Sequence, residues 1–96
     1  MKLKNLNLNS DNITIFTVVY DDVFLVKCDR STFQEIKYCH FEVQKLTVSA
    51  NNDVHIYSSK NYNVRFVMKA FDAGLTVLNA KAEEITKDDF VSYLND

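Results

Sequence analysis

The stretch ITIFTVVYDDVFLVKC (residues 13–28) is the strongest fold signal in the chain. Two runs of β-branched and aromatic residues flank Asp21-Asp22, and such residues favour a pleated, half-buried surface. A two-residue turn between such runs is typical of a β-hairpin, although two aspartates are a weaker turn signal than Asp-Gly. In the first run both alternating faces are largely apolar, which predicts a strand covered on both sides. The stretch therefore predicts strands over residues 13–20 and 23–28.

The segments on either side of this hairpin extend the β-rich interpretation. Residues 5–8 (NLNL) would add a strand through a polar turn at residues 9–12. Further along, turn residues at 51–53 precede a strand over residues 54–58 (VHIYS). Val, Ile, Thr, Phe and Tyr make up 34 of the 96 residues, and proline is absent. Residue types that prefer strands therefore dominate the chain.

Residues 31–49 carry two competing patterns. Thr32 and Glu35 resemble a capping box, which predicts a short helical turn over residues 31–36. The residues that follow, up to about residue 49, fit a strand better because apolar positions alternate there. We therefore expect a helical turn that leads into a strand.

Residues 58–74 (SSKNYNVRFVMKAFDAG) permit either a helix or a hairpin. Four apolar residues follow the i, i+3, i+4, i+7 spacing of an amphipathic helix: Val64, Val67, Met68 and Phe71. Gly74 would then end that helix. The alternative pairs residues 62–70 with residues 75–81 as strands, with Gly74 in the left-handed position of the turn. We expect the hairpin, because the asparagines and β-branched residues of this stretch have poor helix propensity.

The C-terminal segment carries helix signals at its cap and in its first turn. Thr86 is a favourable N-cap residue, and the aspartates that follow it suit the positive end of the helix dipole. Ile85 before the cap and Phe90 inside the helix have the spacing of a hydrophobic staple. These features predict a short helix over residues 87–94. Together, the patterns predict a single small α+β domain over residues 1–96: a mainly antiparallel sheet of about five to seven short, hairpin-connected strands with this C-terminal helix.

Length and charge limit the function classes. A chain of 96 residues forms one domain and leaves little room for a deep substrate cleft beside a core. The net charge of −2 argues against a dedicated duplex-DNA binder, which is strongly basic, and against a polyanionic DNA mimic. No apolar run is long enough for a membrane span, and residues 1–10 lack the apolar region of a signal peptide. We therefore expect a cytoplasmic protein with free thiols and no membrane partner.

Cys28, Cys39, His40 and His55 are the candidates for metal binding or nucleophilic catalysis. A structural zinc site takes paired ligands at short spacing, and these four residues form no such pairs. A cysteine nucleophile beside His55 would need an oxyanion donor, and a chain with one glycine offers no glycine-rich turn for that purpose. We therefore expect no metal, no cofactor and no catalytic residue, with a cysteine-based enzyme as the minor alternative.

The strongest nucleic-acid signal lies in residues 54–71, which hold no acidic residue. Lys60, Arg65 and Lys69 interleave there with four aromatic residues, a combination by which sheet faces hold single-stranded nucleic acid. Three cations give only weak, salt-sensitive attraction, however, and a solvated strand face explains the same pattern. Single-stranded nucleic-acid binding through this cationic hairpin is therefore the alternative function.

A protein–protein interaction module is the function that these exclusions favour. The expected role is an inhibitor or adaptor that occludes a partner protein, with exposed Tyr57, Tyr62 and Tyr93 as contact residues, since tyrosine is enriched at interfaces. Six acidic residues from position 72 onward offer a further surface to a basic partner, and an edge strand would allow a homodimer. Residues with AT-rich codons far outnumber those with GC-rich codons, and nine lysines stand against two arginines. This usage suits a phage or mobile-element gene, and suggests an anti-CRISPR-like protein that blocks a host defence or host enzyme in the host cytoplasm.

Overall fold

The structure is a computed structural model of the chain, and it describes residues 12–36, 43–49 and 53–96. Within these residues, five strands form one sheet in the order β3-β4-β1-β2-β5. Every neighbouring pair is antiparallel except β1 with β4. The elements in chain order are β1 (Asn12–Val19), β2 (Asp22–Asp29), α1 (Arg30–Ile36), β3 (Val43–Val48), β4 (Asp53–Ser58), α2 (Lys60–Asp72), β5 (Thr76–Leu78) and α3 (Lys87–Asn95). The predicted α+β class with a mainly antiparallel sheet and a C-terminal helix is confirmed.

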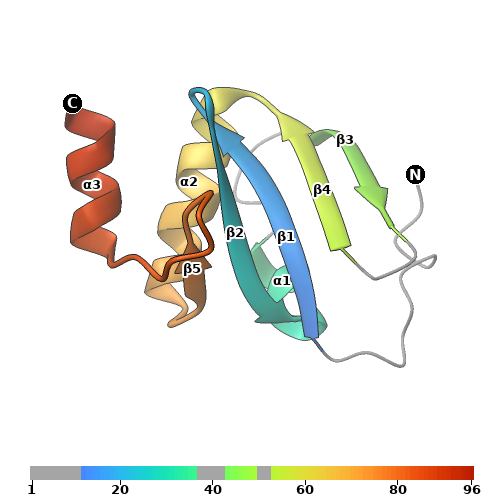
Figure 1. The fold of residues 1–96 in the computed structure, drawn as a ribbon. Helices are drawn as coiled ribbons and strands as arrows, with labels where there is room; N and C mark the ends of the chain where they lie inside the picture. Colours follow the sequence, from blue (N-terminus) through green and yellow to red (C-terminus); the bar gives the residue numbers. More distant parts are fainter. Residues whose placement is uncertain (1–11, 37–42, 50–52) are drawn as a thin grey trace.

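The core lies between one face of the sheet and the three helices. Alternate residues of β1 are buried on this face, as the two-residue period of a strand requires. Phe33 of α1, Phe66 of α2 and Phe90 of α3 are fully buried in the same cluster. Figure 1 shows α1 and α2 behind the sheet, with α3 beside α2. Burial of each phenylalanine contributes about 1.5–3 kcal/mol, so the three rings attach the helices to the sheet.

The predicted hairpin of β1 and β2 is confirmed, but its turn lies one residue earlier than expected. The ladder leaves Tyr20 and Asp21 as the turn residues, and Tyr20 takes φ +57°, a left-handed conformation that two-residue hairpin turns often need. The observed register places Phe16 opposite Leu25. The predicted turn would have placed Phe16 opposite Lys27 instead. Contact between apolar side chains across the strands favours the observed register.

Residues 60–72 form helix α2, so the predicted hairpin in this region is wrong and the alternative helix is correct. Ser59 caps the helix, because its Oγ accepts a hydrogen bond from the Tyr62 backbone N–H at 3.3 Å. The buried stripe of the helix consists of Tyr62, Asn63, Phe66, Val67 and Ala70. Packing of such a stripe supplies most of a helix's stability in a folded protein, so it outweighs the poor intrinsic propensity of these residues.

Gly74 ends α2 in the left-handed conformation, with φ +76°. Its N–H donates to the Phe71 carbonyl and the Leu75 N–H donates to the Ala70 carbonyl, both at 2.9 Å, which is a Schellman motif. The left-handed conformation expected at Gly74 is thus confirmed, and it ends a helix instead of forming the turn of a hairpin. The chain after it, β5, pairs antiparallel with β2 and not with residues 62–70.

Helix α1 begins at Arg30 and is capped by the residue before it. The Asp29 carboxylate accepts a hydrogen bond from the Thr32 N–H at 2.7 Å. The predicted helical turn is confirmed, but the Thr32–Glu35 capping box is wrong, because Thr32 already lies inside the helix. Strand β3, which ends at residue 48, confirms the strand expected to about residue 49.

Helix α3 confirms the predicted C-terminal helix and its cap. Thr86 Oγ1 accepts from the Asp89 N–H at 3.1 Å, and Asp89 Oδ2 accepts from the Thr86 N–H at 3.0 Å. This reciprocal pair is a capping box, and it begins the helix at Lys87. The strand predicted at residues 5–8 and positions 51 and 52 of the predicted turn lie outside the described residues.

Candidate functional site

One face of the sheet carries none of the described helices, and we call it the open face. A row across all five strands comprises Thr47, His55, Phe16, Leu25 and Leu78. Beside this row lie Lys45, Tyr57, Val18 and Val23. The exposed fractions of Val18 and Tyr57 are 45% and 50%, so the expectation that β1 is covered on both sides is wrong at Val18. The open face is therefore a mixed surface, in which apolar side chains that are only partly buried lie beside polar and cationic ones.

Three aromatic rings stack side by side on the open face. Phe16 and His55 face each other with ring centroids 4.6 Å apart and planes within 4° of parallel. Tyr57, two residues along β4, lies 6.5 Å from His55 at an angle of 15°. The Lys45 Nζ is 5.5 Å from the centroid of the Tyr57 ring, which is within cation–π range. Because the rings hold one another in place, little free energy would be spent on ordering these side chains when a partner binds.

Two lysines lie on the open face beside its apolar row. The Lys27 Nζ donates a hydrogen bond to Thr14 Oγ1 at 2.9 Å, which fixes this ammonium group on β2. Lys45 lies on the edge strand β3 beside the Tyr57 ring. Both side chains are exposed. A surface with an apolar centre and carboxylates at matching positions would complement this arrangement.

The three tyrosines predicted as contact residues do not share a surface. Tyr57 is half-exposed on the open face. Tyr62 is fully buried with its ring 6.0 Å from that of Phe66, so its predicted exposure is wrong. Tyr93 is partly buried on α3, where its hydroxyl donates to the Val19 carbonyl at 2.8 Å. Tyr57 is the one of the three that is best placed to contact a partner.

The three cations of the nucleic-acid hypothesis lie on helix α2, so the predicted cationic hairpin is wrong. The Lys60 Nζ lies 3.5 Å from the centroid of the Tyr20 ring. Arg65 and Lys69 are four residues apart and share one side of the helix, whereas Lys60 does not lie on that side. The alternation of cations and aromatic rings along a strand, on which the hypothesis depended, is therefore not formed by these residues.

Cys28 faces the core, with 6% of its surface exposed. Burial, followed by the negative charge of Asp29, raises the pKa of its thiol from an ordinary 9.0 to about 12. The thiol is therefore protonated at neutral pH, which opposes a nucleophilic role. His55 lies on the open face, so it is not placed to act as a base for Cys28. Cys39 and His40 lie outside the described residues.

Several of the acidic residues near the C-terminus have structural partners. The Lys87 Nζ lies 2.8 Å from Asp72 Oδ1, and this hydrogen bond and charge lower the pKa of the Asp72 carboxyl. Hydrogen bonds from Thr86 lower the pKa of the Asp89 carboxyl in the same way. Among the described residues, no group of three or more His, Cys, Asp or Glu could hold a metal ion. No helix in the described part of the chain is long and apolar enough to cross a membrane.

Comparisons with protein-family models, curated proteins and solved structures find no significant match for this chain. The geometry of the open face therefore carries the functional argument. The sequence did not predict Phe16 as a site residue, and it indicated His55 only as a possible metal ligand or catalytic base. Their place on one surface was missed because the parallel pairing of β1 with β4 joins residues far apart in sequence. The alternation in residues 54–58 was the available signal, since it places His55 and Tyr57 on one side of a strand.

Proposed function

We propose that this chain is a protein–protein interaction module that binds a partner protein on its open face. The observation that carries the proposal is a row of partly buried side chains, including Phe16, Leu25 and Leu78, beside the exposed Val18 and Tyr57, on the side of the sheet away from the described helices. Contiguous apolar surface that is not needed for the core is typical of an interaction site. Aromatic residues at the centre of such a surface commonly supply most of the binding free energy.

The partner that fits is a protein surface with an apolar centre and acidic residues around it. The apolar row would be buried against that centre, and the ammonium groups of Lys27 and Lys45 would pair with carboxylates at its margin. Exposed charge pairs of this kind add more to specificity and association rate than to affinity. Binding would occlude the partner's own surface, which is the way an inhibitor or adaptor acts. The residue usage typical of AT-rich genes supports a phage or mobile-element origin, and with it an anti-CRISPR-like action on a host protein.

A differential affinity experiment tests this proposal. The tagged protein, Val18→Ser, Tyr57→Ala and the matched control Val91→Ser would each capture proteins from nuclease-treated lysate for quantitative mass spectrometry. Val91 is a suitable control because it is 37% exposed on α3, away from the open face. A partner that binds the original chain and Val91→Ser, but loses at least about tenfold in affinity with both open-face variants, would support the proposal.

Two results would contradict it. One is a stoichiometric partner that remains bound to both open-face variants, since its contact would lie elsewhere. The other is self-association: if sedimentation shows a dimer that Val18→Ser dissociates, a second copy of this chain occupies the open face.

Single-stranded nucleic acid remains a second candidate, now on the open face instead of α2. The observation that favours it is the combination of three stacked rings with Lys45, since aromatic and cationic side chains on a sheet face hold bases and phosphates. Against it, Phe16 and His55 already cover each other's ring faces, and the net charge is −2. Fluorescence anisotropy with a labelled 12-nucleotide strand would decide. Binding that weakens with salt and is lost in Tyr57→Ala and Lys45→Glu would support this candidate, and no binding at low salt would exclude it.

A further inference from the structure

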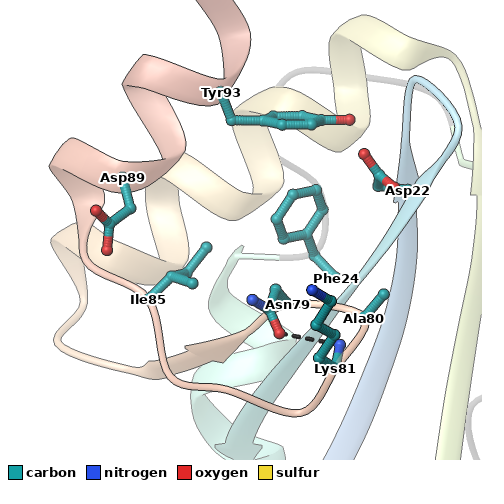
Figure 2. A pocket seen from close by; sticks show the side chains of 8 residues that line it. All are labelled: Asp22, Phe24, Asn79, Ala80, Lys81, Ile85, Asp89 and Tyr93. Carbon is teal, nitrogen blue, oxygen red and sulfur yellow. Dashed lines mark hydrogen bonds between the residues drawn. The ribbon is translucent and has the colours of Figure 1, made fainter.

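A pocket of about 310 Å³ lies on the core side of the sheet, between β2, the loop after β5 and α3. Its apolar walls are Phe24, Ile85 and Tyr93. The rings of Phe24 and Tyr93 meet edge to face, with centroids 5.3 Å apart. Figure 2 shows the two rings above Ile85, with the opening bordered by charged side chains. Ligand pockets typically hold about 300–1,000 Å³, so this volume suits one side chain or a very small ligand.

Hydrogen bonds hold the loop that forms one wall of the pocket. Asn79 Oδ1 accepts from the backbone N–H groups of Lys81 and Glu83 at 2.9 and 3.0 Å. The Ile85 N–H donates to the Val77 carbonyl at 3.0 Å, which fastens the far end of the loop to β5. The wall is therefore formed before any ligand arrives, and little ordering free energy is lost on binding.

Two carboxylates and one ammonium group border this apolar pocket. The carboxylates of Asp22 and Asp89 lie on opposite sides of it, while Lys81 is the one cation among the residues that line it (Figure 2). Burial and then the nearby carboxylates of Asp22 and Asp21 raise the pKa of Tyr93 to about 12. The two carboxylates outnumber the one ammonium group among the lining residues, so the charge of the pocket favours a cation.

The adjacent aromatic surface already holds one ammonium group. The Tyr20 ring contacts the Tyr93 ring edge to face at 5.8 Å, and the Lys60 Nζ lies 3.5 Å from the Tyr20 centroid. This distance is well inside the cation–π range. A second cation, bound in the pocket, would lie beside the Tyr93 ring and the Asp22 carboxylate.

We infer that this pocket binds an arginine side chain presented by another polypeptide. A guanidinium group pairs with a carboxylate through parallel hydrogen bonds and stacks on aromatic faces, so Asp22 and the Tyr93 ring suit it. The methylene stem would lie against Phe24 and Ile85. The site is independent of the open face, because Phe24 belongs to the core side of β2 and the open-face residues belong to the other side.

A ligand titration followed by ¹H–¹⁵N NMR tests this inference on the full chain. The probe is N-acetyl-arginine N-methylamide, and its neutral control is the citrulline analogue, which has nearly the same shape. We expect saturable shifts at Lys81, Ile85 and Tyr93 with the arginine probe and at least tenfold weaker binding of the citrulline analogue. Equal binding of the two probes, equal binding of the lysine analogue, or no saturable shift would overturn the inference.

Matched variants test whether the Asp22 carboxylate contacts the guanidinium group of the probe. Asp22→Asn should weaken binding of the arginine probe about three- to tenfold, because one charge-assisted hydrogen bond is lost. Asp88→Asn is the control, since it removes the same charge from the first turn of α3 at a residue that does not line the pocket. Lys81→Met removes the competing cation and should tighten binding about threefold. An effect of Asp88→Asn as large as that of Asp22→Asn would refute a specific contact.

Discussion

Tyr57 and Tyr62 give opposite expectations for the same substitution. Tyr62 is fully buried, so Tyr62→Ala would leave a cavity in the core and cost about 3–5 kcal/mol of the free energy of unfolding. Tyr57 is half-exposed, and Tyr57→Ala removes a cross-strand contact and a cation–π contact with Lys45. Such contacts contribute about 0.2–1 kcal/mol each, so the expected loss is about 1 kcal/mol. A domain of this size is stable by about 5–15 kcal/mol, so only Tyr62→Ala brings it near unfolding.

Urea denaturation followed by circular dichroism would measure both variants. With a slope of about 1–3 kcal/mol per molar urea, Tyr62→Ala should lower the midpoint by at least about 1 M, and Tyr57→Ala by much less than Tyr62→Ala. Equal losses in the two variants, or a loss below about 1.5 kcal/mol in Tyr62→Ala, would refute the burial argument and the placement of α2 against the sheet. A folded Tyr57→Ala is also the condition under which its effect on partner binding has meaning.

Three further predictions concern caps and titration. Gly74→Ala should cost about 1–2 kcal/mol, from the φ of +76° alone, because no atom lies within 4 Å of the added Cβ; a loss above 3 kcal/mol by denaturation would contradict this. Thr86→Ala should cost about 0.5–2 kcal/mol through loss of the capping box, and Thr86→Ser should recover most of it. The Cys28 thiol has a raised pKa in the folded state, so its contribution is complete below pH 9.0 and is lost as pH rises toward about 12. Relative to Cys28→Ala, the original chain should therefore lose about 1 kcal/mol between pH 9 and pH 10 in urea titrations. Parallel profiles of the two proteins would refute this contribution of the Cys28 thiol.

Local patterns predicted the elements whose signals agreed with one another. The hairpin of β1 and β2 combined strand propensity with a turn, and α3 combined a cap, a staple and an acidic first turn. The signals for α2 disagreed, because its asparagines and valines have poor helix propensity while the spacing of its apolar residues favours a helix. The burial of Asn63 explains the outcome, because its amide donates to the Val18 carbonyl at 2.6 Å and accepts from Ser58 Oγ at 3.1 Å. Asn63 has poor intrinsic helix propensity, but its buried amide makes these hydrogen bonds only when this segment is helical and packed on the sheet.

The open face was less predictable than the fold. Alternation within each strand indicates which side chains share a side, but not which strands are neighbours. The stack of Phe16 on His55 depends on the parallel pairing of β1 with β4, which places the second hairpin beside the first. The pocket beside α3 likewise depends on long-range packing, since Asp22 and Tyr93 lie far apart in the sequence. Such pairings follow from the assembled core and have no local signal.

The register of β1 needs a cause other than hydrophobicity, because both of its faces are apolar. A slip of one residue would exchange its core side with its open side, and an apolar strand opposes this only weakly. Two distant side chains fix the end of the strand: Asn63 donates to the Val18 carbonyl, and the Tyr93 hydroxyl donates to the Val19 carbonyl at 2.8 Å. Val18 lies beyond Phe16, the last β1 residue paired with β4, so Asn63 satisfies a carbonyl where the neighbouring ladder has ended. Since these polar contacts are lost in any other register, α2 and α3 determine which side chains of β1 reach the open face, and so define the proposed contact surface.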